Sequence, residues 1–133
     1  YWVEHGATSL WETFDSTDKG GESQNHHFLG DISSWMIRNI AGINVNPDIT
    51  DISSFKLAPK FIPQISSAAA YYDFSAGRLS CGFEKVGGKI ILNAAVPQGV
   101  CGELALPEGY ALNDGQKNIA LTHGNYRFTV CKG

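Results

Sequence analysis

The sequence predicts a mainly β protein, an antiparallel β-sandwich preceded by a helical segment. Two observations support this fold class. Residues 25–42 repeat apolar side chains at helical spacing, whereas segments after residue 44 alternate apolar and polar side chains between turn residues. The 15 glycines and the 11% of aromatic residues also suit a turn-rich β domain. We therefore expect a loop and one helix in residues 1–43 and a β-sandwich in residues 44–133.

The helix is predicted by apolar side chains three or four residues apart, which form one face of a helix. Ser23 or Asn25 can cap its start, and Gly42 can end it. So wide an apolar face needs cover, either from the sandwich or from helices outside this chain. Its apolar residues are Leu29, Ile32, Met36 and Ile40, with Phe28, Trp35 and Ile37 beside them.

The strands are predicted by alternation with a period of two residues. The runs RLSCGFEK (78–85) and GKIILNAAVP (88–97) each place their apolar residues on one face, and Gly87-Gly88 between them predicts a β-hairpin. Further strands are expected at 101–107, 117–121 and 125–131, separated by turns at 97–99, 107–109 and 113–115. Pro47, Pro59 and Pro63 argue against long helices after residue 44.

The charge and the length of the apolar runs argue against nucleic acid and membrane as partners. A net charge of −3 with 17% charged residues provides no basic surface for nucleic acid. No apolar run is long enough to span a membrane. The first residues, YWVEHGATS, lack both an initiator methionine and the pattern of a signal peptide, which predicts an internal cut in a longer protein. The compartment stays open.

Metal and disulfide sites are not expected. Cys81, Cys101 and Cys131 are widely spaced, which favours buried thiols on strands over a disulfide or a zinc site. His26 and His27 are adjacent and project in different directions, so they do not suit one metal ion. We expect no cofactor.

The stretch GATSLWETF (6–14) places a carboxylate, Glu12, between aromatic residues. One interpretation is a helix start in which Thr8 or Ser9 and Glu12 form a capping box. The other is an active-site acid or base. The stretch alone leaves both open.

GATSLWETF (6–14) is followed by SQNHHFLGDISSWMIRNIAGI (23–43). These two motifs resemble the end of the catalytic barrel of bacterial α-L-rhamnosidases, which carry G-A-T-T-x-W-E-x-W followed by S-x-N-H-Y-x-x-G-x-x-x-x-W and A-G-I. The rest of the chain is similar to that family's C-terminal β-sandwich, in KLAPKF, GGKIILNAAVP and GNYRFTV. The matching residues are Gly6, Ala7, Thr8, Trp11, Glu12, Ser23, Asn25, His26, Gly30, Trp35, Ala41, Gly42 and Ile43.

The resemblance implies an inverting glycoside hydrolase that removes terminal α-L-rhamnose, with an (α/α)6 barrel. By the motif match, Glu12 would be the general base, His26 would contact rhamnose, and Trp11 would wall the sugar subsite. The partners implied are a rhamnosyl glycoside and the missing barrel portion of the same protein, which would supply the general acid. The chain alone is then expected to be inactive.

Three positions depart from the family pattern. Phe14 replaces a Trp of the family motif, Ser9 replaces a Thr, and His27 replaces a Tyr. The substrate could therefore be a related sugar in place of rhamnose. The alternative function is a carbohydrate-binding module without catalysis, in which Tyr71 and Tyr72 form a platform. Residues on one strand alternate between its faces, so only one of these tyrosines is expected to be exposed. A third interpretation makes residues 44–133 a structural support for the barrel.

Overall fold

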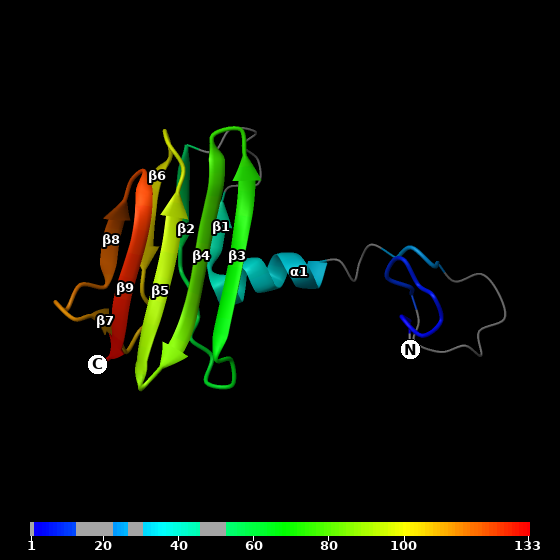
Figure 1. Ribbon diagram of the computed structural model, residues 1–133, viewed down its shortest axis with the longest axis horizontal. Coiled ribbons are helices and arrows are strands. Elements are labelled where there is room, and N and C mark those ends of the chain that lie inside the picture. The colour runs from blue at the N-terminus through cyan, green and yellow to red at the C-terminus, as the bar shows by residue number, and fades with distance from the viewer. Residues whose placement is uncertain (1, 13–22, 27–30, 46–52) are drawn as a thin grey trace. The chain divides into compact units, whose positions relative to one another are not determined.

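The computed structural model describes residues 2–12, 23–26, 31–45 and 53–133. The chain divides into two units, Tyr1–Trp35 and Met36–Gly133. All strands among the described residues belong to the second unit (Figure 1). The predicted boundary between residues 43 and 44 stays a prediction.

The helical segment consists of α1 (Asp31–Met36) followed by a π-helical turn, η2 (Ile37–Ala41). It ends as predicted at Gly42, whose left-handed backbone (φ 84°) lets its amide donate to the carbonyl of Ile37 at 2.9 Å. The predicted start at Ser23 or Asn25 is wrong, because residues 23–26 are not helical. Neither helix in the described part of the chain has the length and apolar character to cross a membrane.

The apolar face of the helical segment is divided between buried and exposed residues. Ile37 and Ile40 are partly buried against the core of the second unit. Ile32 and Trp35 are 60% and 53% exposed. The expected burial is therefore confirmed only for the last turn, and Phe28 and Leu29 lie outside the described residues.

The second unit is a β-sandwich of two sheets (Figure 1). One sheet has the order β1-β2-β6-β8 and the other β3-β4-β5-β9-β7. The strands are β1 (Ile43–Val45), β2 (Ser54–Leu57), β3 (Ser67–Phe74), β4 (Gly77–Val86), β5 (Lys89–Val96), β6 (Cys101–Ala105), β7 (Tyr110–Leu112), β8 (Asn118–Leu121) and β9 (Gly124–Lys132).

The predicted sandwich and its Gly87-Gly88 hairpin are confirmed. β4 and β5 pair through this turn, in which both glycines have positive φ angles (57° and 78°), as a tight hairpin turn requires. The prediction of a wholly antiparallel sandwich needs one correction, because β2 and β6 pair in parallel. Lys56 and Glu103 lie opposite each other in that pair and form an ion pair of 2.8 Å.

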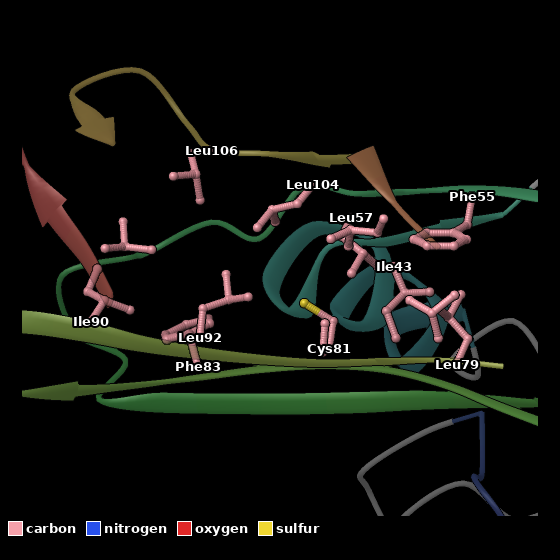
Figure 2. Packing of buried hydrophobic residues seen from close by; sticks show 14 of the residues in the cluster. Ile43, Phe55, Leu57, Leu79, Cys81, Phe83, Ile90, Leu92, Leu104 and Leu106 are labelled. Carbon is pink, nitrogen blue, oxygen red and sulfur yellow. The ribbon is translucent and has the colours of Figure 1, made fainter. Parts of the chain in front are cut away.

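The core lies between the two sheets (Figure 2). The predicted inward faces of β4 and β5 are confirmed, since Leu79, Cys81 and Phe83 face the core together with Leu92 and its neighbours on β5. Burial raises the pKa of the Cys81 thiol to about 12. The second sheet contributes Phe55, Leu57, Leu104 and Leu121.

All three cysteines are free thiols, but the prediction that they are buried holds only for Cys81. Cys131 is half-buried, and its Sγ lies 3.2 Å from Oδ1 of Asn113. Cys101 is exposed, because it is the first residue of β6 and lies on the face of that strand opposite the buried Leu104.

Candidate active site

The first unit brings the two predicted motifs together by backbone pairing. The amide of Glu12 donates to the carbonyl of Ser23 at 2.9 Å, and the amide of His26 donates to the carbonyl of Leu10 at 2.7 Å. The hydroxyl of Ser9 also donates to the carbonyl of Gln24. These bonds place residues 9–12 beside residues 23–26, so Glu12 and His26 become neighbours.

The carboxylate of Glu12 is fixed by a backbone donor. Its Oε2 accepts a hydrogen bond of 3.0 Å from the amide of Ser23. The side chain of Glu12 is 43% exposed, so its carboxylate is open to solvent as well as bound to the amide. A carboxylate held at one oxygen by an amide has acceptor capacity left for a water molecule or a hydroxyl group.

His26 lies beside this carboxylate. Its Nδ1 is 3.9 Å from Oε2 of Glu12, within ion-pair range when the imidazole is protonated, and its side chain is 24% exposed. Trp11, which precedes Glu12, is half-buried. The structure thus brings Glu12 and His26 together, and Trp11 directly precedes Glu12 in the chain.

The capping-box interpretation of Glu12 does not describe this geometry. Residues 7–12 contain no helix, and the hydroxyl of Ser9 bonds to Gln24 instead of capping a helix. Ser23 has a role that the sequence did not predict, since it stood there as a possible helix cap and as a matching residue of the second motif. Its amide is the donor to Glu12, and a backbone donor leaves no signal in residue type.

Other titratable residues also lie near the N-terminus. Glu4 and His5 are exposed and lie in the turn of residues 2–6. His27 lies outside the described residues. Within residues 2–12, 23–26, 31–45 and 53–133, no group of three or more His, Cys, Asp or Glu side chains could hold a metal ion.

Family models match nearly all of the chain in two consecutive parts. Residues 1–40 match the bacterial α-L-rhamnosidase six-hairpin glycosidase domain, and residues 43–120 match the bacterial α-L-rhamnosidase C-terminal domain. The chain belongs to the bacterial α-L-rhamnosidase family. The resemblance found in the motifs around Glu12 and His26 is therefore confirmed at the level of the family.

Individual relatives of this rhamnosidase chain are distant. An α-L-rhamnosidase of Streptomyces avermitilis is 27% identical over 149 aligned positions, which cover 98% of this chain and 14% of that protein. One of Formosa agariphila is 25% identical over 133 positions, covering 95% and 14%. The rhamnosidase chain thus spans about one seventh of the length of these curated relatives.

Solved structures share the fold. An α-L-rhamnosidase from Dictyoglumus thermophilum superposes with a TM-score of 0.77 at 24% identity, covering 99% of this chain and 17% of that one. The Streptomyces avermitilis enzyme, solved in complex with L-rhamnose, superposes with a TM-score of 0.72 at 26% identity, covering 97% and 14%. The fold of this rhamnosidase chain is therefore that of the matching part of both enzymes.

Proposed function

We propose that this chain is the C-terminal part of an inverting α-L-rhamnosidase, in which the first unit contributes the general base and the β-sandwich supports the barrel. The observation that carries the proposal is the position of Glu12. Its carboxylate is oriented by the amide of Ser23, open to solvent, and 3.9 Å from the imidazole of His26.

Inverting hydrolysis needs two carboxyl groups on opposite faces of the sugar, about 6.5–9.5 Å apart, so that a water molecule fits on one side. Glu12 would accept a proton from that water molecule while the water oxygen forms a bond to the anomeric carbon. The second carboxyl group would give its proton to the departing glycosidic oxygen as the old bond breaks. That acid would come from the missing barrel portion.

His26 and Trp11 would act in substrate binding. The imidazole of His26 can donate or accept a hydrogen bond with a sugar hydroxyl next to the water that Glu12 activates. The indole of Trp11, a half-buried residue, would form a wall of the sugar subsite. Rhamnose is the sugar that fits the family, and a related deoxysugar or a uronic acid is the alternative, which the choice of substrate tests.

The experiment compares the isolated chain with the chain joined to a barrel portion. The isolated chain should not hydrolyse an aryl α-L-rhamnoside, because one carboxylate cannot supply both base and acid. Fusing it to the preceding part of its own protein should give hydrolysis, and proton NMR should show that the first product has the inverted anomeric configuration. Turnover by the isolated chain, or a product with retained configuration, would contradict the proposal.

A further inference from the structure

The outer face of the five-stranded sheet carries a shallow depression in the β-sandwich. Its floor crosses three strands, because Ala69 of β3 lies opposite Gly82 of β4, which lies opposite Asn93 of β5. Tyr71, opposite Ser80, forms a side of it. The volume, about 630 Å³, is in the range of small-molecule sites. We call this region the sheet depression.

The depression exists because its floor has almost no side chains. A Cβ atom on Gly82 would lie 2.9 Å from Cβ of Ala69, so these two strands approach closely only because position 82 is glycine. Ala69 is itself small and exposed. The floor is therefore flat and apolar at its centre, with the amide of Asn93 at one end.

Tyr71 rises beside this floor with its ring fixed in place. The guanidinium carbon of Arg78 lies 3.8 Å from the ring centroid, and Arg78 is held by two hydrogen bonds to Asp73, of 2.7 and 2.9 Å. These bonds keep the pKa of Asp73 below its usual value, so the pair is charged at neutral pH. Tyr71 is nevertheless 55% exposed.

The ring has one face left for a ligand. Arg78 covers one face of it, since its guanidinium carbon lies 3.8 Å from the ring centroid. Ala69 and Gly82 lie opposite each other two residues before Tyr71 on β3. Because Tyr71 is 55% exposed and lines the depression together with Ala69 and Gly82, a molecule with one apolar face could contact both the uncovered part of the ring and the floor.

The charges around the depression select against an anionic ligand. Arg78 is neutralised by Asp73, and the other charged residue that lines the depression is the acidic Glu84. Arg127 lines a second hollow that shares Ser80 and Asn93 with the sheet depression and also contains Asn125. Uncharged hydroxyl and amide groups therefore provide most of the hydrogen-bonding capacity.

We propose that the sheet depression binds a neutral pyranose unit of a glycan, stacked on the open face of Tyr71 and hydrogen-bonded by Ser80 and Asn93. A pyranose has an apolar face of C–H groups and a rim of hydroxyl groups. The apolar face would contact the ring of Tyr71 and the floor, and the hydroxyl groups would bond to the hydroxyl of Ser80 and the amide of Asn93. All residues of this site belong to the second unit, whereas Glu12 and His26 belong to the first.

This proposal is tested by following the amide NMR signals of the full 133-residue chain during titration with sugars. The neutral ligands are methyl α-L-rhamnopyranoside and methyl β-D-glucopyranoside, and sodium glucuronate is the anionic comparison. At least one neutral glycoside should shift the amides of Ala69, Gly82 and Asn93 saturably, and more strongly than glucuronate does. Tyr71→Ala should weaken this binding at least about tenfold, whereas Tyr71→Trp should keep it. Stronger binding of glucuronate would overturn the proposal.

Val86→Ala is the matched control, because Val86 is 53% exposed on the same strand as Gly82 and does not line the depression. It should leave the titration unchanged, and the thermal unfolding of every variant shows whether the sheet is intact. Absence of shifts at the three amides with both neutral glycosides would overturn the proposal. Concentration-dependent dimerisation that Tyr71→Ala abolishes would overturn it in favour of a contact between two copies.

Discussion

Nδ1 of His26 lies 3.9 Å from Oε2 of Glu12, although the two residues come from separate segments of the first unit. The pairing of Glu12 with Ser23 and of His26 with Leu10 produces this proximity. The role of Glu12 as general base and the role of His26 in substrate binding are proposals, and each has a distinct kinetic consequence.

Replacing Glu12 with Gln in the enzyme that includes the barrel portion should lower kcat by about 10²–10⁴-fold, because the amide cannot accept the proton of water. The change keeps the shape and the acceptor oxygen, so KM should change little. Steady-state kinetics on an aryl α-L-rhamnoside measures both constants. Glu108→Gln, in an exposed turn of the second unit, is the control for loss of a surface carboxylate. A fall of less than about tenfold would mean that Glu12 is not the base.

Replacing His26 with Ala should clearly raise KM and change the melting temperature little. A substrate contact is lost, but no core residue is removed. His123→Ala provides the contrast. Nδ1 of His123 lies 3.1 Å from the carbonyl of Val96 in the sandwich, so its loss should affect the melting temperature and leave KM unchanged. A His26 variant that melts early with an unaltered KM would assign this residue to structure.

Gly42 and Gly115 both have positive φ angles, but only Gly42 is closely packed. Comparing alanine at the two positions therefore separates the cost of the backbone conformation from the cost of the steric clash. A Cβ atom on Gly42 (φ 84°) would lie 2.2 Å from the backbone nitrogen of Pro59, whereas one on Gly115 (φ 85°) would have no atom within 4 Å. Gly115→Ala should therefore cost only the conformational term of about 1–2 kcal/mol. Gly42→Ala should cost more than about 3 kcal/mol, since backbone must also move. Denaturant unfolding compares them, and equal losses would contradict the packing difference.

The three thiols should react at different rates. A thiol reagent such as Ellman's reagent should modify exposed Cys101 in the folded chain and buried Cys81 only after unfolding. Cys101→Ser should remove the fast phase. Fast modification of Cys81 in the folded state would contradict its burial.

The raised pKa of Cys81 also predicts a pH dependence of stability. The unfolded thiol ionises near its ordinary pKa of 9.0, whereas the folded thiol stays protonated to about 12. Above pH 9 the unfolded state therefore releases a proton that the folded state retains, so the free energy of unfolding should fall between pH 9 and 12. Cys81→Ala should show a smaller fall over the same range. Parallel pH profiles for the two proteins would contradict this linkage.

The sequence by itself determined the features that depend on near neighbours along the chain. Alternation identified the buried faces of β4 and β5, glycines identified their turn, and Gly42 identified the end of the helical segment. The motifs containing Glu12 and His26 identified the family. Each of these signals lies within a few residues, where backbone geometry directly links residue type to conformation.

Only the tertiary structure decided which distant segments pair. The parallel contact of β2 with β6, the exposure of Cys101 and the outward position of Tyr71 all follow from the assignment of strands to sheets. Tyr72 instead packs against the core, as expected for neighbours on one strand. The bond from the amide of Ser23 to Glu12 likewise joins two segments through a backbone group. Every residue except proline carries that donor, so no pattern of side chains could have identified it.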